Sequence, residues 1–569
     1  MEVFDLRRSL SGDRLRVKRR GTDLLRFPLY NKGTGFTREE RRRLGIEALL
    51  PAQYNDIDTQ ARRIVESMGG ERDAFARYLD LAALQDRNEV LFYKVLSLHL
   101  ESLMPIVYTP TVGKACQHYS HVFRRGRGLF ITPDHLGRME EVIRAAAPYA
   151  GVRLMVVTDN EAILGIGDQG AGGMAISVGK LALYCVGAGI HPARTLPISL
   201  DVGTDNRALL DDPLYLGYRS ARLRGDAYQA FVEEFVGAAR AVFPDVIIQW
   251  EDLSKHNALA VLDRYRTVLP SFNDDIQGTG AVASACMRVA HRITGVPLDR
   301  SRVLIYGAGA AGLGIARQWR RQLQHEGMSE DGQASAILVM DSRGVISTDR
   351  PGLESYKCEL AWPAERVASL GLAPANHASL TAVVSAFRPS ALIGASGQSG
   401  VFDEQVVRAM AAGAGRPIIL PMSNPTALTE ALPADLERWT GGTALYATGS
   451  PFDPVATESG LRPVSQANNV FVFPGIGLGA MICNAREITG SMIGAASTAL
   501  AACVTDAEMA QRRLLPDLPR LWDVCGVVAE AVAQQAIADG VARIEDTRSV
   551  PGRLESERWR AAYPIIEAE

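Results

Sequence analysis

Short apolar runs and longer stretches of helical periodicity alternate along most of the chain after about residue 151. The apolar runs that we expect to be buried strands are 154–158, 195–201, 246–250 and 267–272. The helices expected between them are 179–188 and 227–242. This alternation is typical of a mostly parallel sheet covered by helices.

The flanking regions follow different patterns. Residues 37–100 are helical in pattern, whereas a second series of apolar runs begins after residue 274, and the chain after 470 is helical again. We therefore expect an α/β protein with four parts. They are a helical N-terminal domain (1–125), a parallel-sheet substrate and metal domain (126–273, completed by helices 470–540), a Rossmann-type dinucleotide-binding domain (274–469) and a C-terminal tail (541–569).

Composition narrows the class of protein. The chain has 569 residues, 47% of them hydrophobic, and a net charge of −3, which argues against nucleic acid as a partner. The seven cysteines form no CxxC pair, and the first twenty residues lack the apolar stretch of a secretory signal, so we expect a cytoplasmic protein with free thiols. The apolar region 474–503 contains Asn484, Arg486 and Glu487, which argues against a membrane span.

A glycine-rich turn follows the expected strand 302–306 and opens a helix. Its glycines, at 307, 309 and 312, allow a tight turn and close approach of a pyrophosphate to the helix N-terminus, although the same pattern also occurs in tight packing turns. The predicted cofactor-binding residues of this turn are Gly307, Ala308, Gly309, Ala310, Ala311 and Gly312.

The next expected strand, 336–341, ends in Asp341, where an acid commonly bonds a ribose hydroxyl. Ser342 and Lys357 follow and are suited to a 2′-phosphate instead. Arg343 is a further candidate for the 2′-phosphate, and an ordinary polar loop is the alternative interpretation of Ser342, Arg343 and Lys357.

Pairs of acids follow two of the expected strands. Glu251 and Asp252 come after 246–250, and Asp274 and Asp275 come after 267–272. In open α/β sheets this edge binds ligands, and carboxylate oxygens are the ligands that Mg²⁺ and Mn²⁺ prefer. Glu251, Asp252 and Asp275 are therefore the candidate metal ligands, with exposed loop acids as the alternative.

Lys180 lies within the apolar stretch 176–183. A buried lysine has a lowered pKa and is able to act as a base, whereas a snorkelling lysine is the alternative. Asn424, Asn468 and Asn469 occupy short polar motifs, which taken alone are more often turn residues than ligands.

Taken together, these motifs resemble the malic enzyme family. The matching stretches cover nearly the whole chain in the family's order, and they are 31–33, 108–113, 125–131, 163–168, 178–180, 250–252, 272–278, 423–426 and 468–469. The resemblance implies metal-dependent oxidative decarboxylation of L-malate to pyruvate and CO₂ with reduction of NAD(P)⁺. It also implies a homodimer or homotetramer.

The resemblance assigns roles to matching residues. Tyr108 is expected to be the general acid, Lys180 the general base, and Asp274 the residue that pairs with Lys180. Asn424 and Asn469 are expected to hold the substrate, with Asn468 near it and Asn424 also near the cofactor. Within the family, a serine after the strand-end aspartate and a lysine further on accompany NADP, so Ser342 and Lys357 favour NADP over NAD.

One position departs from the family pattern. Malic enzymes usually carry an arginine that binds the substrate carboxylate immediately before Ile163, and this chain has Ala162. An alanine makes no bidentate carboxylate contact. The alternatives are therefore a malolactic conversion of malate to lactate, an altered 2-hydroxy acid substrate, or a catalytically impaired homologue. The malic pattern around Tyr108 and the intact set of acids favour malic enzyme activity.

Overall fold

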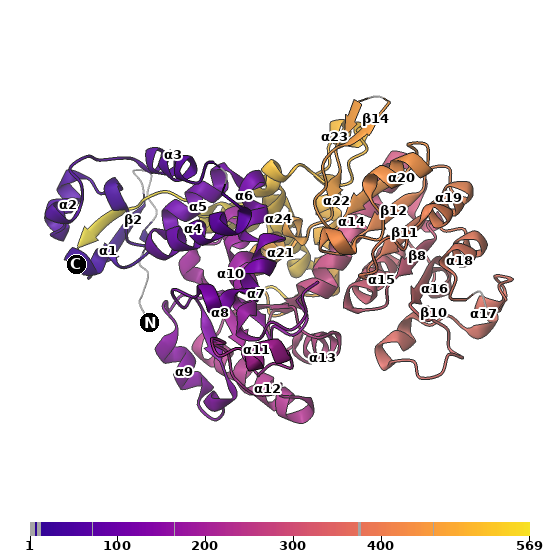
Figure 1. Cartoon of the computed structure of the whole chain (residues 1–569), viewed down its shortest axis with the longest axis horizontal. Coiled ribbons are helices and arrows are strands. Elements are labelled where there is room, and N and C mark those ends of the chain that lie inside the picture. The colour runs from indigo at the N-terminus through magenta and orange to yellow at the C-terminus, as the bar shows by residue number, and fades with distance from the viewer. Residues whose placement is uncertain are drawn as a thin grey trace. The chain divides into compact units, whose positions relative to one another are not determined.

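The computed structural model describes residues 6–7, 13–70, 72–163, 165–373, 377–458 and 460–568. Contacts divide the chain into two compact units (Figure 1). Unit 1 consists of residues 1–253 and 555–569, and unit 2 consists of residues 254–554.

Helices dominate the first part of unit 1, as the periodicity predicts. They are α1 Gly21–Leu25, α2 Arg38–Leu44, α3 Ile57–Ser67, α4 Ala74–Arg87, α5 Glu89–Leu98, α6 Leu100–Val107, α7 Thr111–Gln117 and α8 Tyr119–Val122. The α2 N-terminus is a capping box. Thr37 Oγ1 accepts a hydrogen bond from the Glu40 amide at 3.2 Å, and Glu40 Oε2 accepts one from the Thr37 amide at 2.9 Å. A small sheet joins β1 Leu6–Arg7 and β2 Arg14–Val17 to β17 Ile565–Ala568 near the C-terminus.

The larger sheet of unit 1 is parallel. Its strands within unit 1, in spatial order, are β3 Leu129–Ile131, β5 Thr195–Leu200, β4 Leu154–Thr158 and β6 Ile247–Glu251. Register pairs Thr158 with Glu251, so the carboxyl ends of β4 and β6 meet. Helix α10, Met174–Leu183, contacts β4, β5 and α7, and the other helices of this part are α9 Met139–Ala146, α11 Arg207–Asp211 and α12 Gly225–Val242.

One helical stretch among the described residues, Gly170–Ala188, is long and apolar enough to cross a membrane by length and composition. It contains α10, and 89% of its most apolar window is buried inside the protein.

Unit 2 contains the predicted Rossmann-type sheet. Its strands, in spatial order, are β10 Gly344–Val345, β9 Ile337–Asp341, β8 Val303–Tyr306, β11 Ala391–Gly394, β12 Ile418–Pro421, β13 Leu445–Thr448 and β16 Ser465–Gln466. Only the edge strand β10 is antiparallel to its neighbour among these pairs. Strands β9 and β10 lie on one side of β8, and the later strands, beginning with β11, lie on its other side. In doubly wound sheets, ligands bind at the point where the strand order reverses in this way.

Helices and short strands complete unit 2. The helices are α13 Lys255–Tyr265, α14 Thr279–Thr294, α15 Ala310–His325, α16 Glu330–Ala336, α17 Ala364–Ala368, α18 Leu380–Phe387, α19 Glu404–Gly413, α20 Pro433–Trp439, α21 Phe473–Ile482, α22 Gly490–Ala502, α23 Asp506–Ala510 and α24 Leu521–Ala538. The strands outside the main sheet are β7 Ser271–Asn273, β14 Val455–Thr457 and β15 Gly460–Arg462, and α25 Val550–Glu557 follows α24.

The grouping of the C-terminal helices differs from the sequence-based expectation. We expected helices 470–540 to complete the substrate domain and a boundary at 273, whereas contacts group α21, α22 and α24 with unit 2 and place the division after Leu253. The reason is packing, because α22 contacts α14 and α24 contacts both α21 and α22. Residues 555–569 belong to unit 1 instead, since β17 pairs with β2.

Small residues let the first helices of unit 2 approach closely. A Cβ added to Gly280 of α14 would lie 2.5 Å from the carbonyl oxygen of Gly314 in α15. A Cβ added to Gly314 would lie 1.9 Å from the carbonyl oxygen of Ile276. These contacts are backbone to backbone, so no side chain is able to move aside.

Replacing Gly314 therefore tests the helix crossing. Gly314→Ala is expected to lower the free energy of unfolding by about 1–3 kcal/mol, because the backbones must separate. Gly494→Ala is the matched control, since its Cβ would meet only Gln318 Nε2 at an ordinary 3.5 Å. We expect the control to be neutral or to stabilise by up to about 1 kcal/mol. Urea denaturation of both variants measures this, and equal stabilities would contradict the close crossing.

Candidate active site

Two acids stand where strand β6 ends in unit 1. Glu251 is the last residue of the strand and Asp252 follows with φ of 52°, a left-handed conformation that turns the chain sharply. Both side chains are buried. Lys180, on α10, is buried as well, and its Nζ lies 2.9 Å from Glu251 Oε1. The snorkelling alternative for Lys180 is therefore wrong.

A chain of buried hydrogen bonds holds the second oxygen of Glu251. Gln249 Nε2 donates to Glu251 Oε2 at 2.8 Å, and the Tyr184 hydroxyl donates to Gln249 Oε1. Tyr184 begins a π-helical turn, Tyr184–Ala188, that continues α10. Sequence reasoning missed both residues. Their signal was spacing, because Gln249 shares a strand face with Glu251 and Tyr184 lies four residues after Lys180 on the same helix.

Tyr108 follows the last residue of α6 and lies beside Lys180. Lys180 Nζ is 5.3 Å from the centroid of the Tyr108 ring. Gly179 makes this possible, because a Cβ there would lie 2.8 Å from the Val107 carbonyl oxygen. Unit 1 thus brings Tyr108, Lys180 and Glu251 together, as their proposed catalytic and metal-binding roles require.

Ala162 lies in the turn after β4, next to the same acids. Its amide donates to the Asp252 carbonyl oxygen at 2.9 Å. The turn is held by Arg222, which donates to both carboxylate oxygens of Asp168, at 2.8 and 2.9 Å, and to the Asp159 carbonyl oxygen at 2.8 Å. The position expected to hold a substrate carboxylate is therefore at the acid cluster and carries only a methyl group.

Unit 2 supplies the other predicted polar residues. Asp274 is fully buried, and Asn469 Nδ2 lies 3.1 Å from its Oδ2 and 3.2 Å from its carbonyl oxygen. Asn424 Nδ2 donates to the Gly449 carbonyl oxygen at 3.1 Å, whereas Asn468 Oδ1 accepts from the Val470 amide at 2.9 Å. Asn468 thus caps a local turn, and Asn469 is the residue held against Asp274.

The glycine-rich turn lies between β8 and α15, as predicted. Gly307 has φ of 122°, and a Cβ there would lie 2.2 Å from the Ala395 carbonyl oxygen. A Cβ at Gly312 would lie 1.8 Å from the Gly307 carbonyl oxygen, whereas one at Gly309 would meet no atom within 4 Å. The first and third glycines therefore permit tight packing, and the second leaves space at the start of α15 for a phosphate group.

Asp341 ends β9 next to this turn and is heavily paired. Both its carboxylate oxygens lie 2.6 Å from Arg350 Nη2, and Lys357 Nζ donates to Oδ2 at 2.9 Å. Burial opposes ionisation, but these two cations outweigh it and lower the pKa of Asp341 to about 2. The pairing therefore stabilises the fold fully above the ordinary aspartate pKa and is lost as the pH falls toward 2. Sequence reasoning did not identify Arg350 as a partner of Asp341. The predicted cofactor-binding residue Ser342 is exposed.

The acids fit a hard divalent cation by their chemistry. Glu251 and Asp252 offer oxygen donors at one strand end of unit 1, and Asp275 stands after β7 in unit 2. Mg²⁺ and Mn²⁺ prefer such donors. Their joint binding of one ion and the expected pairing of Asp274 with Lys180 stay predictions.

Family models match most of the chain. Residues 85–266 match the malic enzyme N-terminal domain, and residues 276–537 match the malic enzyme NAD-binding domain. The chain belongs to the malic enzyme family. The family resemblance of the sequence motifs is thereby confirmed.

Curated relatives of this malic enzyme family member align over nearly their full length. The NAD-dependent malic enzyme of Sodalis glossinidius is 43% identical over 549 residues, which is 96% of this chain and 97% of the relative. The NAD-dependent malic enzyme of Pectobacterium atrosepticum is 43% identical over 543 residues, which is 95% of this chain and 96% of the relative.

Solved structures of malic enzymes share the fold. The Entamoeba histolytica malic enzyme has a TM-score of 0.57 and 23% identity, covering 90% of this chain and 91% of that one. The enzyme from Pyrococcus horikoshii Ot3 has a TM-score of 0.53 and 22% identity, covering 80% and 88%.

The energy of the buried pair is open to measurement. Glu251→Leu is expected to lower the free energy of unfolding by about 3–5 kcal/mol, because it removes the carboxylate that pairs with the Lys180 ammonium. The double variant Lys180→Met/Glu251→Leu is expected to be more stable than the sum of the single changes predicts, by more than about 1 kcal/mol. Urea denaturation with a chelator present measures both.

An exposed pair provides the control for this cycle. Glu39 Oε1 and Arg43 Nη1 lie 3.3 Å apart on the surface of α2. Glu39→Gln is therefore expected to lower the free energy of unfolding by less than about 1 kcal/mol. Additive effects of the Lys180 and Glu251 changes would contradict an energetic role for the buried pair.

Proposed function

We propose that the protein is an NAD-dependent malic enzyme that converts L-malate and NAD⁺ to pyruvate, CO₂ and NADH with Mg²⁺ or Mn²⁺. The observation that carries this proposal is the cluster formed by the half-buried Tyr108 with the buried Lys180 and Glu251. It supports a reaction that moves protons next to a bound cation. The names of the curated relatives agree with this activity.

Each group has a role in the proposed reaction. Lys180, acting as the neutral amine, takes the proton from the C2 hydroxyl of malate onto Nζ while hydride leaves C2 for the nicotinamide. After CO₂ departs, the Tyr108 hydroxyl gives a proton to C3 and pyruvate forms. Asp274 would pair with Lys180. The 5.3 Å between Lys180 Nζ and the centroid of the Tyr108 ring supports placing both side chains in one site.

The remaining polar residues would bind metal and substrate. Glu251, Asp252 and Asp275 would hold the cation, which supplies Lewis-acid stabilisation of negative charge on the substrate when bound. Asn424 and Asn469 would contact malate. The bond from Asn469 to Asp274 supports a position for this amide beside the acids.

NAD is the proposed cofactor rather than NADP. We expected NADP from Ser342 and Lys357, and the names of the curated relatives do not support that preference. The Lys357 ammonium lies 2.9 Å from Asp341 and 2.7 Å from Glu354. A 2′-phosphate would have to compete with both carboxylates for this cation, whereas NAD leaves the pairs intact.

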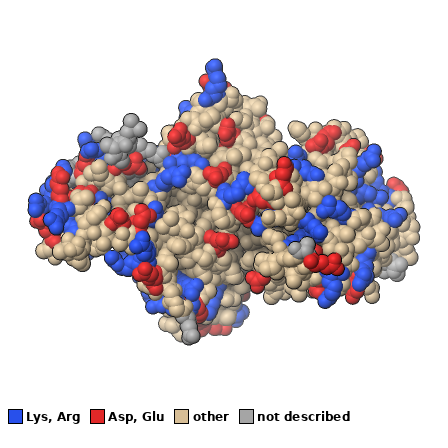
Figure 2. Space-filling model, turned by 90° about the horizontal axis from the view of Figure 1, so that it is seen from above, with Lys and Arg blue, Asp and Glu red and all other residues tan. Residues whose placement is uncertain are grey.

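The setting of the enzyme is also a proposal. We infer a cytoplasmic homodimer or homotetramer without a nucleic-acid or membrane partner. Lys and Arg side chains are interspersed with Asp and Glu on the face seen in Figure 2, which supports the absence of a polyanion partner.

Ala162 favours a second candidate, a malolactic conversion of malate to lactate or activity on a related 2-hydroxy acid. The Ala162 amide donates a hydrogen bond to the Asp252 carbonyl oxygen. The position that carries an arginine in other family members therefore lies beside the acids and has no guanidinium in this chain. Product analysis separates the two candidates.

The decisive assay uses purified protein, L-malate and Mn²⁺, with NAD and NADP in separate reactions. We expect reduced cofactor and pyruvate in equal amounts, and faster turnover with NAD. Absorbance of the reduced cofactor and product chromatography of the same sample measure this. Lactate without net cofactor reduction would assign the malolactic reaction, and neither product would direct the search to other 2-hydroxy acids.

Restoring a guanidinium at position 162 tests the substrate class. Ala162→Arg is expected to lower KM for malate about tenfold, since a charge-assisted bond to a carboxylate is worth about 1.5–3 kcal/mol. Ala162→Gln adds a shorter polar side chain without the charge and is expected to leave KM nearly unchanged. An equal effect of both variants in steady-state kinetics would argue against a substrate carboxylate at this position.

A further inference from the structure

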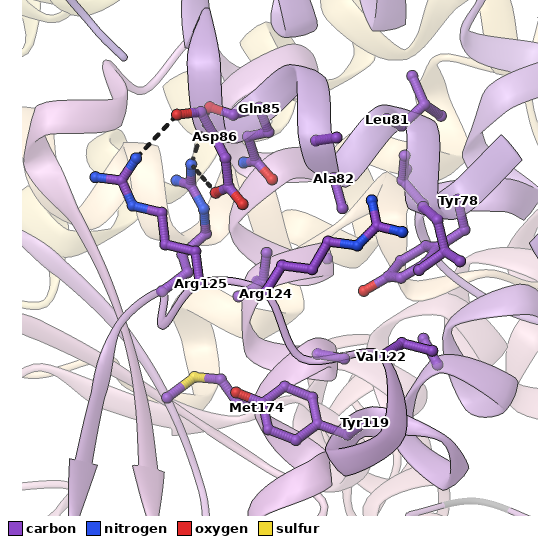
Figure 3. A pocket seen from close by; sticks show the side chains of 18 of the residues that line it. Tyr78, Leu81, Ala82, Gln85, Asp86, Tyr119, Val122, Arg124, Arg125 and Met174 are labelled. Carbon is purple, nitrogen blue, oxygen red and sulfur yellow. Dashed lines mark hydrogen bonds and ion pairs between the residues drawn. The ribbon is translucent and has the colours of Figure 1, made fainter. Parts of the chain in front are cut away.

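A cavity of about 120 Å³ opens within unit 1 beside the catalytic helix (Figure 3). Its walls come from α4, α5, α6, α7, α8 and α10. Most of the lining is apolar and includes Leu81, Ala82, Phe92, Val107, Met174 and Val178. No role in the proposed reaction falls to this cavity.

Several polar groups converge on the apolar walls. Figure 3 shows the Arg124 side chain reaching across the cavity toward Tyr78, with Tyr119 and Met174 along another wall. Within the described part of the chain, the Arg124 guanidinium and the hydroxyls of Tyr78 and Tyr119 have no hydrogen-bond partner. Burial raises the pKa of both tyrosines, so they remain protonated and able to donate at neutral pH.

The cavity carries an excess of positive charge. Arg127 is neutralised, because its Nη1 lies 2.7 Å from Glu89 and its Nη2 lies 3.5 Å from Asp86. Arg125 donates instead to the backbone carbonyl of Asp86, at 3.0 Å. Three arginines, at 124, 125 and 127, face the two carboxylates of Asp86 and Glu89, which leaves one net positive charge at the cavity and favours an anion.

We propose that this cavity binds a small carboxylate with an apolar body, whose carboxylate meets Arg124 and whose body fills the space over Ala82 and Met174. The volume holds about ten water-sized groups, which matches an aromatic or branched acid of about ten non-hydrogen atoms. Such pockets, mostly apolar with a few convergent polar groups, are typical of small-molecule sites.

The cavity shares its walls with the catalytic residues. Val107 and Gly179, which line it, directly precede Tyr108 and Lys180. Tyr78 and Tyr108 also pack against one hydrophobic cluster, formed by Val112, Ala115, Cys116, Ile163, Ala175 and Ile176. An occupant would therefore contact Val107 and Gly179, the residues that precede the two proposed proton-transfer groups. For this reason the proposed site is regulatory. This regulatory part rests on the proposed function, whereas the binding part does not.

Binding is tested with phenylacetate as the probe, by calorimetry on the full-length protein without substrate. Wild type is expected to bind phenylacetate and not the neutral phenylacetamide. Arg124→Gln is expected to weaken binding about tenfold, by loss of the charged donor. Ala82→Phe, which fills the cavity from α4, is expected to abolish it. Arg38→Gln is the control, since Arg38 is exposed on α2 outside the cavity.

Binding of phenylacetamide as strong as that of phenylacetate, or unchanged binding to Arg124→Gln and Ala82→Phe, would overturn the site. Regulation is tested separately in the malate assay, where phenylacetate is expected to change kcat or KM at least twofold in wild type and in Arg38→Gln but not in Ala82→Phe. Binding without that change would overturn the regulatory part alone. Because calorimetry needs no turnover, an inactive protein would contradict the proposed function and leave the binding result standing.

Discussion

The buried contact between the Lys180 ammonium and the Glu251 carboxylate is the constraint on which unit 1 depends. Removing two charges from water is costly, and the interior repays that cost only with close geometry and further hydrogen bonds. Gln249 and Tyr184 supply those bonds to the second Glu251 oxygen. Helix α10 and strand β6 must therefore meet in one register, and that register places Lys180 beside Tyr108.

Contact of backbone with backbone is the second recurring device. Gly179 lets α10 approach the end of α6, Gly312 lets α15 approach the turn after β8, and Gly314 lets α15 approach Ile276. In each place a side chain would meet a carbonyl oxygen that is itself part of a fixed element. Lys180 and the glycine-rich turn after β8 are thus positioned by the same physical means, in separate units. The close approach of α10 to the end of α6 also forms part of the wall of the cavity beside Arg124, because Val107 and Gly179 line it.

The chain keeps the residues that we propose transfer protons and the candidate metal ligands, while it carries an alanine at position 162. That position bonds through its backbone to Asp252, so under the proposed function we expect the difference to concern recognition of the substrate rather than proton transfer. This chain retains Tyr108, Lys180 and the acids but carries alanine at position 162. We therefore expect Ala162 to change the affinity for the substrate more than the rate of the proposed proton transfers.

Local patterns in the sequence determined much of this protein. Strand and helix periodicity, the glycine turn before α15, Asp341 at a strand end and the acids after β6 all follow from neighbours within a few residues, and the structure has them as predicted. Tertiary structure alone decided that α21, α22 and α24 group with unit 2. It also decided that Arg350 neutralises Asp341 and that Gln249 and Tyr184 orient Glu251. The helix grouping and the Tyr184–Gln249 bond join segments that are distant in the sequence, and periodicity carries no information about such contacts. Arg350 and Gln249 lie near their partners in the sequence, but periodicity does not say which of several nearby polar side chains will meet a buried charge.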